Sequence, residues 1–223
     1  MPLKLITGGG GSVILDANTT ATTYTMYVPA ENGTLVTTAS PVLGNASGLT
    51  TGTLPTARLP SIPKSNMPSG SILQVVNTLK SDTMASGTSE TWLDVTGMSA
   101  TITPTSSTSK IYVHVCVGRF YGTNSVVWRV LRNGGLYNAG DAASSRQQVH
   151  AAESNQGLDP NHTGQLLLTY IDSPTTTSSL TYQLQFRQEG TNFTFNRNGS
   201  DSDITNSYAS RSSSSIILME IAG

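Results

Sequence analysis

Few side chains in this sequence have the chemistry of a catalyst or a metal ligand. The histidines are His114, His150 and His162, and the single cysteine is Cys116. One cysteine cannot form a disulfide within the chain, and four residues scattered in this way do not make a Cys/His zinc set. Serines are so numerous that a Ser-His-Asp set could be chosen arbitrarily, and such a choice carries no information. The sequence therefore predicts no enzyme active site, no cofactor and no metal.

Two of these residues share one predicted strand. His114 and Cys116 alternate with Val113, Val115 and Val117, which form the apolar side of residues 111–120. A strand histidine in this position is predicted to pack or to lie in an interface, because a base also needs a nucleophile and an orienting group beside it. Cys116 is interpreted as a small buried apolar residue.

An acidic stretch near the C-terminus offers oxygen atoms of the kind that calcium binds. It contains Asn198, Asp201 and Asp203. The stretch lacks the ligand spacing and the terminal glutamate of an EF-hand loop. We therefore expect a turn whose acids are solvated.

The composition describes a chain with few charges. Hydrophobic residues make up 36% and charged residues 11% of the sequence, and the net charge is -1, whereas about 25% of the residues of ordinary domains are charged. No cluster of Lys and Arg offers a grip on phosphates, so nucleic acid is not an expected partner. No apolar run of about 18 residues and no secretory signal occurs. We expect synthesis in the cytoplasm and no membrane insertion.

Three zones of the chain differ in residue composition and spacing. Residues 1–40 hold short β-branched and aromatic runs between Gly, Pro and Asn, which predicts strands joined by turns. About 40 residues cannot bury a core alone, so this zone must pack on something else. Residues 41–69 contain several prolines, which forbid a continuous helix or a central strand. Leucines nevertheless recur there at positions 43, 49, 54 and 59, and in three parallel copies they would face a common axis as in a fibre shaft.

The third zone, residues 70–223, is long enough for one globular core. Apolar residues alternate with polar ones in residues 111–120 and 180–187, which is typical of half-buried strands. The predicted strands are residues 72–76, 91–95, 100–103, 111–120, 125–131, 165–171, 180–187, 193–195 and 214–221. The predicted core residues are Val113, Val115, Trp128, Leu184, Phe186, Ile217 and Met219. Many short strands with little helix predict an antiparallel β-sandwich resembling a jelly roll.

A long segment without periodicity, residues 132–164, separates two confident strands. A connection of this length is uncommon in a compact domain and often carries function. Its polar and aromatic side chains suit contact with sugars or with a partner surface, and covering a sheet edge or building a subunit interface is an equally good interpretation. The candidate partner-binding residues are Tyr137, Asn138, Arg146, Gln147, Asn155 and His162.

Three segments resemble fibre proteins of tailed bacteriophages. Residues 48–60 (GLTTGTLPTARLP) resemble a segment that recurs in tail-fibre shafts, and the N-terminal runs at 11–15, 24–30 and 33–38 are similar to modules found with such shafts. Residues 213–222 (SSSIILMEIA) resemble the last strand of phage knob domains, which are often trimeric jelly rolls. The chain is shorter than long tail fibres, which usually have many more shaft repeats.

The resemblance implies an all-β homotrimeric virion protein. Residues 1–40 are expected to form a virion-attachment module, residues 41–69 a Pro/Gly-rich shaft, and residues 70–223 the knob. The leading hypothesis is a tail fibre or spike for host attachment, whose partners are other virion proteins and a cell-surface glycan or protein. The alternative is a capsid decoration or head-fibre protein. A polysaccharide-cleaving enzyme is disfavoured, because it needs two converging carboxylates and Asp plus Glu number 13 here, most of them on predicted turns.

Overall fold

The computed structural model describes residues 62–155 and 159–223, which form strands and two short 3-10 turns. The predicted N-terminal module and residues 41–61 of the predicted shaft lie outside the described residues. The elements are η3 (Lys64–Asn66), β1 (Ile72–Lys80), β2 (Met84–Ser86), β3 (Leu93–Ile102), β4 (Lys110–Gly122), β5 (Asn124–Arg132), β6 (Gly135–Leu136), β7 (Ala151–Asn155), β8 (Gly164–Asp172), β9 (Leu180–Gln188), β10 (Phe193–Phe195), η4 (Ser207–Ala209) and β11 (Ser214–Ile221). The all-β prediction is confirmed for this part of the chain.

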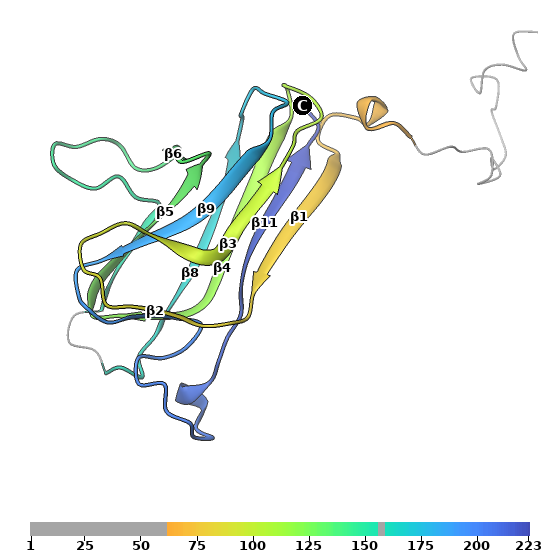
Figure 1. Ribbon diagram of the computed structural model, residues 1–223. Helices are drawn as coiled ribbons and strands as arrows, with labels where there is room; N and C mark the ends of the chain where they lie inside the picture. The colour runs from red at the N-terminus through yellow and green to blue at the C-terminus, as the bar shows by residue number, and fades with distance from the viewer. Residues whose placement is uncertain (1–61, 156–158) are drawn as a thin grey trace, which may run out of the picture. The chain divides into compact units, whose positions relative to one another are not determined.

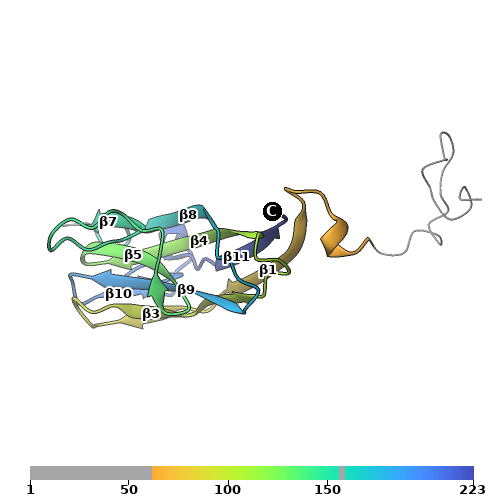
Figure 2. The ribbon, with the colours of Figure 1, turned by 90° about the horizontal axis from the view of Figure 1, so that it is seen from above.

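The strands form two antiparallel sheets that pack on each other (Figure 1). In the first sheet β11 lies between β1 and β4, β8 pairs with β4, and the short strands β10 and β2 continue from the end of β4. In the second sheet β9 lies between β3 and β5, and β6 and β7 both pair with β5. Both views place β1 and β11 at one side of the sandwich and β5 at the other, and Figure 2 shows β7 next to β5.

The core lies between the sheets and is built from alternate residues of each long strand. Val113 and Val115 of β4 face Trp128 of β5 and Leu184 and Phe186 of β9, and all five are fully buried. Trp128 is the centre of an aromatic cluster, with its ring 4.8 Å from Phe120 and 5.9 Å from Phe193. Burying a side chain of this size contributes about 1.5–3 kcal/mol, so the alternation seen in the sequence directly specifies the sandwich.

The prediction for the last strand chose the wrong face. In β11 the buried apolar residues are Ile216 and Leu218, while Ile217 and Met219 point outward and are half-buried. Residues 216–219 are all apolar, so their periodicity cannot tell which side faces the core. Pairing with β4 decides it, because Leu218 lies opposite the buried Val113. Cys116, also predicted to be buried, lies on the same outer side and is half-buried.

Two further predictions are corrected by local backbone geometry. The strands predicted at residues 91–95 and 100–103 are one strand, β3, whose register with β9 shifts between Asp94 and Ser99. Gly97 lies in this irregularity with a φ of 82°, a left-handed conformation that glycine adopts without steric cost. The segment 132–164 is not one long loop, because it contains β6 and β7.

Candidate functional site

The structure does not bring the six predicted partner-binding residues together. Tyr137 and Asn138 follow β6, next to β8, where the Asn138 amide donates a 3.3 Å hydrogen bond to the carbonyl of Ile171. Asn155 ends β7 and pairs through its backbone with Asn124, at the opposite end of β5 from β6. His162 is exposed just before β8 begins. The candidates are therefore spread over both ends of the sandwich.

Tyr137 is mainly a packing residue. Its ring contacts those of Tyr170 and Tyr182, with centroids 5.6 and 5.9 Å away, and the Arg132 guanidinium lies 4.9 Å from its centre. Its hydroxyl is buried and has no hydrogen-bond partner within the described residues, and the same holds for the hydroxyl of Tyr170 and for Nε2 of His150. Burial raises the pKa of Tyr137 far above its ordinary value.

An ion pair next to this aromatic cluster ties the two sheets together. Both carboxylate oxygens of Asp172 accept hydrogen bonds of 2.7 Å from Nη1 of Arg132, and the Tyr182 hydroxyl donates to the same carboxylate at 2.6 Å. Asp172 lies in β8 and is 3% exposed. Removing either partner would leave an uncompensated buried charge, which is strongly destabilising, so Asp172 and Arg132 have a structural role.

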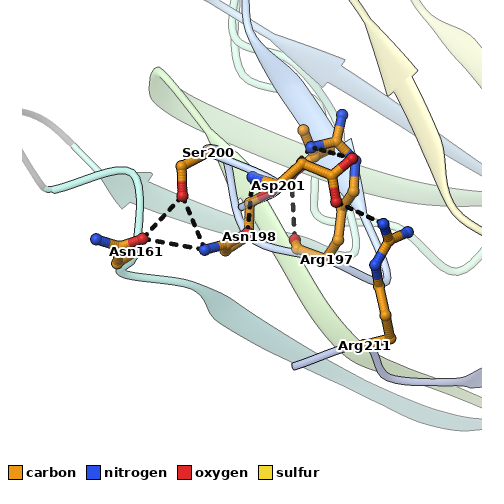
Figure 3. Close-up of polar contacts among 7 residues, drawn as sticks. Asn161, Arg197, Asn198, Ser200, Asp201 and Arg211 are labelled. Atoms are coloured by element: carbon orange, nitrogen blue, oxygen red, sulfur yellow. Dashed lines mark hydrogen bonds and ion pairs between the residues drawn. The ribbon is translucent and has the colours of Figure 1, made fainter. Parts of the chain in front are cut away.

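The acidic stretch predicted to be a turn is joined by side-chain hydrogen bonds to the loop that precedes β8 (Figure 3). Asn161 Oδ1 accepts hydrogen bonds from Asn198 Nδ2 at 3.0 Å and from Ser200 Oγ at 2.9 Å. Asp201 is paired with Arg211 at 2.6 Å and lies 3.6 Å from Arg197. The carboxylate of Asp201 is therefore neutralised by arginines, which disfavours a cation there. Within residues 62–155 and 159–223 no group of three His, Cys, Asp or Glu side chains could hold a metal ion.

His114 has the surroundings of a surface residue of a sheet. Its Nδ1 lies 3.2 Å from the hydroxyl of Thr169, and its ring stacks on Tyr112 with a centroid distance of 6.2 Å and an interplanar angle of 10°. The contacts within the described residues are a hydroxyl and an aromatic ring, and neither orients a histidine as a carboxylate would. The non-catalytic interpretation of His114 remains a prediction.

The outer side of the β1-β11-β4-β8 sheet carries an apolar surface that sequence reasoning did not identify. We call it the apolar face and define it by three rows of paired residues. The rows are Val75, Met219, Tyr112 and Ile171; Asn77, Ile217, His114 and Thr169; and Leu79, Ser215, Cys116 and Leu167. None of these twelve residues is Asp, Glu, Lys or Arg. Val75, Leu79, Leu167 and Ile171 are 56%, 63%, 66% and 52% exposed.

The outer side of the β3-β9-β5 sheet has the opposite character. Asp94, Gln185 and Arg129 lie side by side across the three strands. Arg129 Nε donates a 2.8 Å hydrogen bond to Gln185, and Gln185 donates a 2.7 Å hydrogen bond to Asp94. The Arg129 guanidinium stacks 3.9 Å from the ring centre of Trp92. Trp92 Nε1 in turn donates a 3.3 Å hydrogen bond to Gln147, which is one of the predicted partner-binding residues.

Comparisons with known proteins add no assignment to this geometry. No protein-family model matches the chain, and no curated protein matches it significantly. No helix in residues 62–155 and 159–223 is both long and apolar enough to span a membrane.

Proposed function

We propose that this chain is a homotrimeric structural subunit of a bacteriophage particle, a short tail fibre or spike that attaches the particle to its host. The observation that carries the proposal is the apolar face. A soluble protein rarely exposes a large contiguous apolar surface unless that surface meets a partner. Four large aliphatic side chains that are more than half exposed, in rows free of Asp, Glu, Lys and Arg, have the character of an interface centre.

A second copy of the same chain fits this face better than a charged partner does. The three rows present methyl, methylene and aromatic groups, with Asn77, Ser215, Thr169 and His114 as polar members. A partner that brought charges onto this surface would leave them desolvated without a counter-ion, which costs several kcal/mol per charge. A partner surface that is equally apolar has no such cost. The apolar face of another protomer is a surface of this kind.

We also propose that the sandwich is a jelly roll, as the resemblance to phage knobs implies. The eight longest strands divide between the sheets as β1-β11-β4-β8 and β3-β9-β5-β7, so that consecutive strands repeatedly cross from one sheet to the other. A double sheet of eight antiparallel strands is the architecture of jelly rolls in capsid and lectin domains. This arrangement leaves the apolar face free for neighbouring protomers and the opposite face for other partners.

The buried acids support a non-enzymatic role. Glycoside hydrolysis needs a pair of carboxylates that converge on the substrate. Within the described residues the buried acids are Asp172 and Glu220, and both are occupied by structural hydrogen bonds. The alternative function within the virion class is a capsid decoration or head-fibre protein, which would use the same protomer on the shell.

The proposal is tested on particles of the phage that encodes the chain. Electron microscopy with a label on the knob should place it on the tail; a label on the capsid would favour the head-fibre alternative, and absence of the protein from purified particles would refute a virion role. Deleting residues 1–40 should abolish incorporation while the knob stays folded, because these residues are expected to attach the protein. Normal incorporation of the deletion variant would contradict that assignment.

A further inference from the structure

The outer side of the β3-β9-β5 sheet carries a group of side chains that the structural role does not explain. We call it the Trp92–Arg129 platform and define it as Trp92, Asp94, Arg129, Gln147 and Gln185. It lies on the outer side of the sheet opposite the apolar face, so trimer formation through the apolar face leaves it accessible. Trp92 directly precedes β3 and Asp94 lies in it, while the other residues come from β5, from β9 and from the segment after β6.

The guanidinium of Arg129 is held in one orientation. One side stacks on the Trp92 ring at 3.9 Å, and Nε is fixed by the 2.8 Å hydrogen bond to Gln185. Trp92 is itself fixed by its hydrogen bond to Gln147. A guanidinium that is restrained on a flat ring loses less conformational entropy when it forms another hydrogen bond. The guanidinium of Arg129 is thus held in place before any ligand binds.

Two groups of the platform have unused hydrogen-bonding capacity. Within the described residues the hydrogen bond that Arg129 donates is the one from Nε, so its terminal nitrogens are unused, and Asp94 accepts through Oδ1 while Oδ2 accepts none. Gln185 bridges Nε of Arg129 and Oδ1 of Asp94, so these free donors and the free acceptor lie on neighbouring positions of one surface. Their charges are opposite, so the platform carries no net charge.

We propose that the Trp92–Arg129 platform binds an uncharged saccharide through two adjacent hydroxyl groups. One hydroxyl oxygen accepts hydrogen bonds from the terminal nitrogens of Arg129, and the next hydroxyl donates to Asp94 Oδ2. Trp92 and the side-chain amides of Gln147 and Gln185 supply the apolar and polar surroundings that orient small ligands. An anion is disfavoured because Asp94 would repel it, and a cation because Arg129 would. The inference rests on the proposed function, to which it adds a ligand class.

Intrinsic fluorescence provides a direct binding assay. The chain has two tryptophans, and Trp128 is fully buried in the core. A ligand on the platform therefore changes the emission of Trp92 selectively. The probes are the methyl α-glycosides of glucose, galactose and mannose, with glucuronate as the charged comparison. We expect at least one neutral glycoside to bind the full-length protein with a Kd on the order of 1 mM.

Two substitutions separate the roles of the free groups. Arg129→Lys keeps the charge but removes the planar fork, and it should weaken binding of the neutral glycoside at least tenfold. Asp94→Asn replaces Oδ2, the acceptor for a ligand hydroxyl, by an amide nitrogen and leaves the positive charge of Arg129 without a counter-charge. It should therefore weaken binding of the neutral glycoside and strengthen binding of glucuronate, each by about tenfold. Thr101→Ala, on the same face but paired with Thr181, is the control and should leave binding unchanged.

The proposal is overturned if no neutral glycoside changes the fluorescence up to about 50 mM, roughly fifty-fold above a Kd of about 1 mM. Tighter binding of glucuronate than of any neutral glycoside to the unsubstituted protein would also overturn it, as would unchanged binding by Arg129→Lys. Light scattering on the same samples keeps the two proposals apart, because a trimer that binds no glycoside refutes only the ligand site. A monomer that binds a glycoside refutes only the assembly.

Discussion

Replacing Ile171 by aspartate is the sharpest perturbation of the apolar face. Ile171 lies on the outer side of β8 in the row that contains Tyr112 and is 52% exposed. In the free protomer an aspartate at this position remains in contact with water. In the proposed trimer it would be placed in a contact made largely of aliphatic and aromatic side chains. The variant should therefore fold as a protomer and fail to assemble.

The magnitude follows from burial. Fully burying an isoleucine side chain is worth about 1.5–3 kcal/mol, and roughly half of that is gained within the protomer, so assembly loses about 1 kcal/mol of apolar contact. Desolvating the new carboxylate costs several kcal/mol more. A total of at least about 3 kcal/mol per protomer corresponds to a more than hundredfold weaker association at each contact.

The matched control is Ile204→Asp. Ile204 is 46% exposed and lies in the connection before β11, outside the apolar face. Sedimentation equilibrium of the two variants should show dissociation for Ile171→Asp and an unchanged mass for Ile204→Asp, with the same β-type circular dichroism in both. An undissociated Ile171→Asp protein, or equal dissociation of both variants, would refute the assignment of the interface to this face.

Two further predictions concern buried titratable groups. Burial by itself raises the pKa of Glu220, but hydrogen bonds from Thr105, Ser109 and Gln74 outweigh this effect and hold the pKa below 4.5. The stability that these hydrogen bonds give is therefore present above pH 4.5 and is lost as the pH falls through the lowered pKa. Glu220→Gln should lower the free energy of unfolding at neutral pH by about 2 kcal/mol in urea titrations, and an unchanged midpoint would contradict this. Burial lowers the pKa of His150 below 6.5, so its contribution to stability is complete above pH 6.5 and declines as the pH falls below it. His150→Gln should flatten this part of the pH–stability curve, and an identical slope in both proteins would show that His150 is not responsible.

Alternation predicted much of the fold because several strands are buried on one side only. In β4 and β9 apolar residues alternate with polar ones, so the faces of Val113, Val115, Leu184 and Phe186 could be assigned from the sequence. β7 was missed because Ala151–Asn155 is too polar to show a period. Such a strand is specified by its hydrogen bonds to a neighbouring strand, here β5. The local alternation of apolar and polar residues does not reveal this pairing.

The candidate surfaces were harder to predict for a related reason. The apolar face is assembled from single residues of four strands that are far apart in the sequence, and only the register of those strands brings Val75 next to Met219. The apolar run at residues 216–219 contained a signal, because a strand that is apolar on both sides meets a partner on both. Trp92 was part of a predicted strand, but its contacts with Arg129 and Gln147 depend on tertiary structure.

The oligomeric mass of the purified full-length protein is the decisive test of the proposed homotrimer. Light scattering coupled to gel filtration at micromolar concentration should give three times the chain mass of 23.4 kDa, under reducing as well as oxidising conditions, because the single cysteine allows no disulfide within a chain and the apolar face needs none between chains. A monomeric mass at these concentrations would contradict the account, since the apolar face would then be exposed to solvent without a second copy to cover it.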